Sequence, residues 1–172
     1  FIPPIPGVDT VPFWTHRDAL DNKELPASLA IIGGGVIGIE FASFFNSLGV
    51  QVTVIEMLDE ILGGMDKELS ALLRAEYAKR GIKFMLSTKV VSLAEASSED
   101  GKPQVQVNFE NAEGTGSVLA EKLLMSVGRR PVTKGFGLEN LELKRTERGN
   151  ICTNEQMQAS APGVYILSLI HI

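Results

Sequence analysis

The chain contains 172 residues, of which 44% are hydrophobic, and it carries a formal net charge of −5 at pH 7. This length allows a buried core, and the ordinary apolar content excludes a disordered chain. The modest negative charge argues against a nucleic-acid partner, and no apolar run is long enough to span a membrane. The single cysteine, Cys152, cannot form an internal disulfide and predicts no metal cluster. We therefore expect no metal site and a cytoplasmic or mitochondrial matrix compartment.

The first 25 residues predict a linker followed by a short helix. Residues 2–7 read Ile-Pro-Pro-Ile-Pro-Gly, and such proline density is typical of a segment that arrives from a preceding domain. Residues 18–25 are expected to form the short helix, which ends before Pro26. We therefore expect residues 1–25 to connect the next domain to an earlier one.

The next part of the chain, residues 26–135, predicts a domain in which strands and helices alternate. Continuous apolar runs predict parallel strands at residues 29–33, 50–55 and 82–86. Amphipathic segments between them predict helices at residues 36–48 and from Asp66, as N-cap, to Gly81. The predicted fold class is α/β, with a Rossmann-like doubly wound parallel sheet.

The pattern changes after residue 88 and predicts an antiparallel β-meander that crosses over within this sheet. Residues 89–94, 104–109 and 117–121 are short runs separated by polar and glycine turns. Apolar and polar residues alternate along the second run, which predicts one buried and one solvated face. Residues 122–127 form a further apolar run that we expect to return to the parallel sheet.

A glycine pattern separates the first expected strand from the first long helix, and it reads Gly33-x-Gly35-x-x-Gly38. In a βαβ unit the first glycine permits a sharp turn, the second lets backbone N–H groups approach a pyrophosphate, and the third permits close packing. The helix N-terminus adds unpaired N–H groups and a favourable dipole. The pattern therefore predicts a dinucleotide site, and the alternative is a glycine-rich turn without a ligand.

Glu56 ends the second expected strand, about twenty residues after the glycine turn, where dinucleotide-binding folds place an acid. Its carboxylate would accept hydrogen bonds from the hydroxyls of the adenine ribose and would repel a 2′-phosphate. No arginine or lysine follows until Lys67. We therefore predict NAD rather than NADP as the cofactor, and the alternative is a solvated acid at a strand end.

Four stretches together resemble the pyridine nucleotide–disulfide oxidoreductases, over nearly the whole chain to about residue 167. These stretches are residues 33–40, 56–66, 126–131 and 148–151. The resemblance is greatest to the flavoproteins that serve 2-oxo-acid dehydrogenase complexes. It implies that residues 26–135 form an NAD-binding domain and that residues 136–167 return to a flavin domain, from which residues 1–25 arrive.

The resemblance also implies which residues contact NAD. These are Gly33, Gly34, Gly35, Val36, Ile37, Gly38, Ile39, Glu40, Glu56, Val90 and Gly128. Glu40 would position the nicotinamide beside the flavin, or would be only an acid stabilised by the helix dipole. Val90 would pack against the adenine, or would be an ordinary strand residue. We assign no catalytic residue to this chain.

Several parts of the family's catalytic machinery have no counterpart in this sequence. These are the Cys-x-x-x-x-Cys redox pair, the flavin-binding glycine turn and the His–Glu acid–base pair. Cys152 is expected to be a small buried residue. Where the family continues into a Gly-Asp that contacts the flavin, this chain has Ser168 and Leu169, and we expect residues 168–172 to be non-native.

The sequence therefore predicts the NAD-binding part of a larger enzyme, inactive by itself. The larger enzyme would contain FAD, transfer electrons between a dithiol and NAD, form a homodimer and join a 2-oxo-acid dehydrogenase complex. Two alternatives stay open at this point. One is a related flavoenzyme such as an NADH oxidase or a mercuric reductase, and the other is a module that senses NAD without catalysis.

Overall fold

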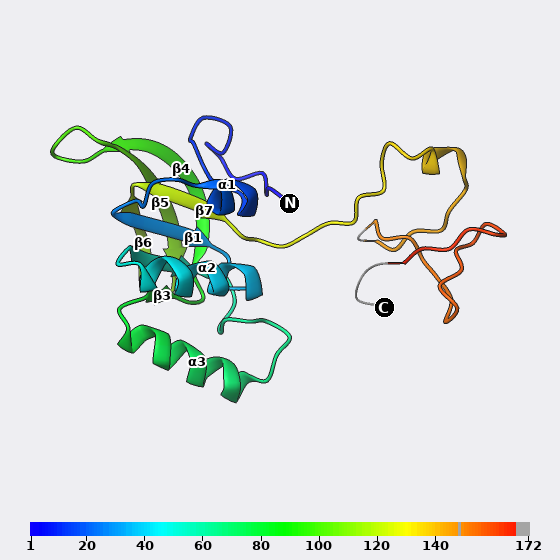
Figure 1. The fold of residues 1–172 in the computed structure, drawn as a ribbon, viewed down its shortest axis with the longest axis horizontal. Helices are drawn as coiled ribbons and strands as arrows, with labels where there is room; N and C mark the ends of the chain where they lie inside the picture. Colours follow the sequence, from blue (N-terminus) through cyan, green and yellow to red (C-terminus); the bar gives the residue numbers. More distant parts are fainter. Residues whose placement is uncertain (148, 168–172) are drawn as a thin grey trace. The chain divides into compact units, whose positions relative to one another are not determined.

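The structure is a computed structural model that describes residues 1–147 and 149–167, and it contains two compact units, Phe1–Gly128 and Arg129–Ile172. The first unit holds all the named α-helices and strands of the described residues (Figure 1). Among the described residues, no helix combines the length and apolar character needed to span a membrane.

A parallel sheet of four strands forms the centre of the first unit, in the order β3-β2-β1-β7. The strands are β1 (Ser28–Ile32), β2 (Gln51–Ile55), β3 (Lys83–Met85) and β7 (Lys122–Met125). Ile32 is in register with the last residues of both neighbouring strands, so three strands end at the same edge. The predicted strands agree with these bounds to within one or two residues.

A second, antiparallel sheet of three strands, in the order β4-β5-β6, forms the predicted meander. Its strands are β4 (Lys89–Ser97), β5 (Pro103–Asn111) and β6 (Gly114–Ala120). Val105 and Val107 are buried on the inner face of β5, whereas the polar residues next to them, Gln104, Gln106 and Asn108, are half-buried. The predicted alternation is therefore confirmed.

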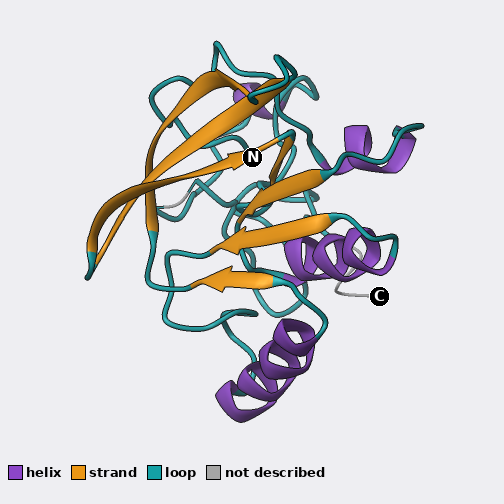
Figure 2. Ribbon diagram, turned by 90° about the vertical axis from the view of Figure 1, so that its left-hand side faces the viewer, coloured by secondary structure: helices purple, strands orange, loops and turns teal. Residues whose placement is uncertain are grey.

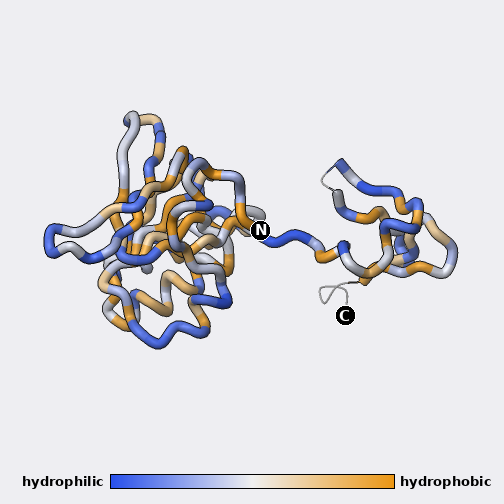
Figure 3. The backbone as a smooth tube through the Cα atoms, turned by 90° about the horizontal axis from the view of Figure 1, so that it is seen from above, coloured by the Kyte–Doolittle hydropathy of each residue, from blue (hydrophilic) through white to orange (hydrophobic). Residues whose placement is uncertain are grey.

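The two faces of the parallel sheet bury different sets of side chains. On one face Leu29 and Ile31 of β1 pack with α2 residues such as Phe45. On the other face Ala30 and Ile32 pack with the meander. Figure 2 shows the α-helices of this unit on one side of the strands, and Figure 3 shows hydrophobic segments at the centre of this unit. The predicted α/β fold class is confirmed, with the meander covering the face opposite the helices.

The helices are α1 (His16–Asp21), α2 (Val36–Ser47) and α3 (Lys67–Lys79). The carboxylate of Asp66 accepts hydrogen bonds from the Glu68 and Leu69 amides, which confirms it as the N-cap of α3.

The first helix was expected at residues 18–25, and this prediction is wrong by several residues. The carboxylate of Asp18 accepts hydrogen bonds of 2.7 Å from both the backbone N–H and the hydroxyl of Thr15. These bonds fix the helix N-terminus at Thr15, so α1 begins before Asp18, and it ends at Asp21 rather than at Leu25.

The N-terminal segment is packed against the rest of its unit. Val8 and Val11 are buried in the core on the meander side. The N–H of Trp14 donates to Leu123 C=O at 2.7 Å, and Met125 N–H donates to Trp14 C=O at 2.9 Å, so Trp14 extends the sheet beside β7. Whether residues 1–25 also connect to a flavin domain stays a prediction.

The second unit has little regular structure of its own. Its described residues contain one short 3₁₀ turn, Leu138–Asn140, and two isolated bridges that join Arg145 to Ile151 and Gln158 to Tyr165. No described residue of this unit is buried. Cys152 is exposed, so its prediction as a buried residue is wrong. The predicted non-native tail, residues 168–172, lies outside the described residues.

Candidate functional site

A cleft of about 670 Å³ lies at the carboxyl ends of the central strands of the first unit. Its walls come from the ends of β1 and β2, the glycine turn, the start of α2 and β4, and the segment after β7. Of the residues predicted to contact NAD, seven line it: Gly33, Gly35, Val36, Ile37, Glu56, Val90 and Gly128. The cleft therefore brings together the glycine turn and the acid that the sequence placed about twenty residues apart.

The glycine turn is shaped by close backbone packing. Gly33 has φ +106°, and a Cβ there would lie 2.3 Å from the carbonyl oxygen of Ser126. A Cβ on Gly38 would lie 2.1 Å from the carbonyl oxygen of Gly33. These two glycines let the turn and the first turn of α2 pack directly on the strand ends, as their positions in the motif predict.

Gly35 differs from these two glycines because a Cβ there would meet no protein atom within 4 Å. It is the N-cap of α2 and has an extended backbone, with no side chain to cap the helix. The described residues therefore leave open space next to the Gly35 Cα, on the wall of the cleft.

The start of α2 presents backbone donors beside this space. The hydrogen bond from Ile39 N–H to Gly35 C=O, 3.0 Å long, closes the first turn of the helix. The amides of Val36, Ile37 and Gly38 precede it and have no acceptor within the helix. Their N–H groups and the helix dipole together favour an anion at this position.

The carboxylate of Glu56 joins the glycine turn to the loop after β2. Its Oε2 accepts a hydrogen bond of 2.6 Å from Gly34 N–H, and its Oε1 accepts one of 2.8 Å from Leu58 N–H. A carboxylate can accept about four hydrogen bonds, so both oxygens keep acceptor capacity beyond these two bonds. The carboxylate is thus fixed in orientation by backbone donors and can still accept donors from a ligand in the cleft.

Glu56 and Lys89 are the two charged residues among the described ones that line the cleft. The Nζ of Lys89 lies 2.9 Å from Oε1 of Glu110 on the neighbouring strand. The positive charge of Lys89 is therefore balanced by Glu110, while the charge of Glu56 is held by neutral amides.

Most of the cleft wall is apolar. Val36 and Met57 are more than half exposed, and Val90 is half-buried at the start of β4. Apolar walls with few, well-placed polar groups are typical of sites that bind small molecules and cofactors.

Four predicted contact residues lie outside the cleft lining. Gly34 and Gly38 lie in the glycine turn, where Gly34 donates to Glu56 and Gly38 packs on Gly33. Ile39 is only 3% exposed and packs in the core on the helix side. Glu40 is exposed at the start of α2 and lines a different hollow.

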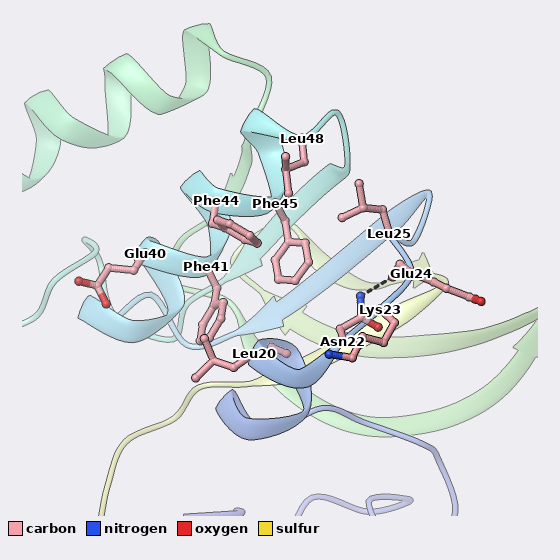
Figure 4. Close-up of a pocket in the computed structure, with 11 residues that line it drawn as sticks. Leu20, Asn22, Lys23, Glu24, Leu25, Glu40, Phe41, Phe44, Phe45 and Leu48 are labelled. Carbon is pink, nitrogen blue, oxygen red and sulfur yellow. Dashed lines mark hydrogen bonds between the residues drawn. The ribbon is translucent and has the colours of Figure 1, made fainter.

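This second hollow is a groove of about 500 Å³ between α1 and α2. Figure 4 shows Phe41, Phe44 and Phe45 along it, and Glu40 at its edge with the carboxylate pointing away from the rings. The structure therefore does not bring Glu40 into the cleft that contains Glu56.

Some residues that line the cleft had no signal in the sequence. They include Pro3, Ile5 and Thr88. The N-terminal segment reaches the cleft because Leu93 N–H donates to Pro6 C=O at 2.8 Å, which holds the segment against the start of the meander. Its proline-rich sequence gave no signal for this position.

The sequence matches the pyridine nucleotide-disulphide oxidoreductase family over residues 1–167. The chain belongs to this family. The resemblance inferred from the four sequence stretches is therefore confirmed.

Two curated members of the family illustrate the similarity. The dihydrolipoyl dehydrogenase of Thermus scotoductus is 41% identical over 157 residues, which cover 90% of this chain and 33% of that protein. The human mitochondrial dihydrolipoyl dehydrogenase is 36% identical over 169 residues, which cover 96% of this chain and 33% of that protein. The chain thus spans about a third of the length of these relatives.

A solved structure of a flavoprotein disulfide reductase has a similar fold. The HOCl-induced flavoprotein disulfide reductase RclA from Escherichia coli matches with a TM-score of 0.82 and 30% sequence identity. The match covers 96% of this chain and 36% of RclA.

Proposed function

We propose that this chain is the NAD(H)-binding part of a flavin-dependent dithiol–disulfide oxidoreductase, with dihydrolipoyl dehydrogenase as the activity of the whole protein. One observation carries the proposal: in a single cleft, the Glu56 carboxylate lies beside the amides of the glycine turn and the start of α2. The names and identities of the curated relatives support the same activity.

The residues of the cleft fit a dinucleotide. The amides at the start of α2 would bind the pyrophosphate, and the open space at Gly35 would let it approach them. The spare acceptor capacity of Glu56 would bind the ribose hydroxyls of the adenosine. Val90 and the other apolar wall residues would pack against the rings, and Gly128 would line the site after β7.

We further propose that the cofactor is NAD rather than NADP. A 2′-phosphate would have to approach the negative charge of Glu56. Met57 and Leu58, the next residues, are neutral, and the charge of Lys89 is balanced by Glu110. Glu56 would therefore repel a 2′-phosphate, and no unpaired cation among the described lining residues of the cleft would offset this repulsion.

When bound, NAD⁺ would accept a hydride from the reduced flavin of the whole protein. The task of this chain is to hold the coenzyme so that its nicotinamide meets the flavin. We propose that FAD and the redox disulfide belong to other parts of the whole protein, which would form a homodimer within a 2-oxo-acid dehydrogenase complex. Glu40 would help to position the nicotinamide only when the rest of that protein is present.

A second candidate is another flavoprotein disulfide reductase with the same kind of nucleotide domain. The similarity to RclA over 96% of this chain favours it. A steady-state assay of the full-length protein with dihydrolipoamide and NAD⁺ separates the two, because dihydrolipoyl dehydrogenase must oxidise this dithiol.

The coenzyme proposal is tested by replacing Glu56. E56A removes the ribose acceptors and should weaken NADH binding by about 1.5–3 kcal/mol, the value of a hydrogen bond to a charged group. E56R should weaken NADH binding and improve NADPH binding. Fluorescence titration of the 172-residue chain measures both dissociation constants.

E95A is the matched control, because Glu95 is an exposed glutamate on β4 outside the cleft lining. It makes the same change in net charge as E56A and should leave NADH binding unchanged. A wild-type chain that prefers NADPH would contradict the choice of cofactor, and one that binds neither coenzyme would contradict the proposed function.

A further inference from the structure

The loop between β2 and α3 is tied to the glycine turn by specific contacts. Leu62 N–H donates to Gly34 C=O at 2.8 Å. Ile61 is only 1% exposed, and its Cγ2 lies 3.2 Å from the position of a Cβ on Gly34. Gly34 is also the residue whose N–H donates to Glu56. A shift of this loop would therefore displace the glycine turn and the ribose-binding carboxylate together.

A bidentate ion pair fixes this loop to α3. The Nε and Nη2 of Arg74 donate to the two carboxylate oxygens of Glu60, at 2.8 and 2.9 Å. The side chain of Glu60 is 12% exposed, and its Oε1 also accepts a hydrogen bond from Ile61 N–H. Hydrogen bonding by Arg74 holds the pKa of Glu60 below its usual value. Such paired, partly buried geometry orients a loop more firmly than a surface ion pair does.

The same loop makes a second ion pair with α3, which is exposed and has a single contact. Lys67 Nζ lies 2.7 Å from Oδ2 of Asp59, and both side chains are more than 70% exposed. An exposed, single-contact pair of this sort stabilises a protein little because water and salt screen it. The loop therefore offers two neighbouring acids that both pair with α3, Glu60 through a partly buried bidentate ion pair and Asp59 through an exposed single contact.

We propose that Glu60 and Arg74 are positioning residues for the coenzyme site. Through Ile61 and Leu62 they hold Gly34 in place, and through Gly34 they hold the Glu56 carboxylate toward the ribose. They thereby set the preference for NADH over NADPH without touching either coenzyme. This inference rests on the proposed function, since it concerns the same cleft.

The physical consequence of breaking the pair follows from what Glu56 does. A loosened loop lets the Glu56 carboxylate sample orientations in which it no longer accepts the ribose hydroxyls. NADH then loses binding energy, whereas NADPH loses part of the repulsion that the fixed carboxylate causes. The dissociation constant for NADPH divided by that for NADH should therefore become smaller. A general loss of stability would not change this ratio.

The experiment compares three variants of the 172-residue chain: E60Q, R74Q and the control D59N. E60Q and R74Q each break the bidentate pair, and D59N removes the exposed pair in the same loop with the same change of charge as E60Q. Fluorescence titration measures the dissociation constants for NADH and NADPH. We expect E60Q and R74Q to weaken NADH binding by about five- to tenfold. An effect of this size lies within the range of interaction energies measured between residues of one hydrogen-bond network.

A second measurement requires no coenzyme. Hydrogen exchange of the Gly34 and Leu62 amides should be faster in E60Q and R74Q than in the wild type and in D59N. If E60Q or R74Q does not fold, R74K keeps the charge and one hydrogen bond. It should give intermediate exchange rates and an intermediate NADH affinity.

The outcomes separate this inference from the function on which it rests. If the wild type binds NADH and the E60Q and R74Q variants bind it equally well, the inference is wrong and the proposed function is unaffected. Equal effects of D59N and E60Q would also overturn the inference, because any loosening of the loop would then suffice. A wild-type chain that binds neither coenzyme would end both proposals.

Discussion

The first unit has two hollows that share one helix but are built from different chemistry. The first turn of α2 lies on the cleft, where Val36 and Ile37 face open space beside Glu56. The following turns lie on the groove, where Phe41 and Phe44 are among the lining residues. In the cleft the polar groups are backbone amides and one oriented carboxylate, whereas the groove is lined mainly by apolar side chains.

The two hollows differ in the selectivity that their lining groups can provide. Backbone amides at a helix start are placed by the fold itself and cannot change rotamer, so they bind an anion with little ordering cost. An apolar groove attracts non-polar surface of any kind, since the hydrophobic effect has no direction. We therefore expect substitutions in the cleft to change coenzyme binding and substitutions in the groove to leave it unchanged.

The largest effect should come from Gly33, because its substitution breaks the packing that forms the cleft. G33A adds a Cβ that would lie 2.3 Å from the Ser126 carbonyl oxygen, at a residue with φ +106°. Overpacking and the unfavourable backbone conformation together should lower the free energy of unfolding by about 3 kcal/mol. Urea denaturation followed by circular dichroism measures this change.

Gly49 provides the control that separates the two causes. It has φ +88°, but a Cβ there would meet no atom within 4 Å. G49A should therefore lower the free energy of unfolding by only about 1 kcal/mol, because the unfavourable backbone conformation is its single cost. Equal destabilisation by G33A and G49A would show that close packing at the glycine turn is unimportant.

Much of the fold could be predicted from the sequence because its signals are local. The apolar runs predicted the parallel strands, and alternation predicted the inner face of β5. The meander strands are longer than predicted: β4 continues through Glu95 to Ser97, and these residues pair with Val105 and Pro103. Pairing through backbone hydrogen bonds requires no apolar side chain, so the hydrophobic pattern underestimates exposed strand ends.

The candidate site could be predicted only where one motif contained its residues. Gly33, Gly35 and Glu56 follow from their spacing around a strand and a helix. Ile5 reaches the cleft through the tertiary packing of the N-terminal segment, and no local pattern records that packing. The placement of Glu40 on the groove likewise depends on how α1 packs beside α2.

The next largest effect tests the cleft without changing the fold. Gly35 has an ordinary extended backbone, with φ −72° and ψ 178°, and open space beside its Cα. G35A should therefore lower the free energy of unfolding by only about 0.5 kcal/mol, because alanine is a poorer N-cap than glycine. Its methyl group would stand between the amides of α2 and a pyrophosphate, and NADH should bind about tenfold more weakly, a loss of about 1.4 kcal/mol.

Titration with NADH and urea denaturation of the same G35A sample check this prediction. Comparing G33A with G35A then separates two roles in the glycine turn. Gly33 permits the packing that forms the cleft, and Gly35 leaves room in the cleft for the ligand. Unchanged NADH affinity in a stable G35A variant would mean that the ligand does not approach Gly35, and the pyrophosphate would have to be placed elsewhere.

The smallest effect is expected in the groove, at Phe44. Its side chain is 55% exposed and contacts the buried ring of Phe45 edge-on, with 5.2 Å between ring centroids. F44A removes an aromatic ring that is about half buried, and it should lower the free energy of unfolding by about 1 kcal/mol. NADH affinity should stay at the wild-type value, because the groove contributes no donor or acceptor to the cleft. A drop in affinity as large as that of G35A would show that the two hollows are coupled through α2, and the helix would then have to move as one body when the coenzyme binds.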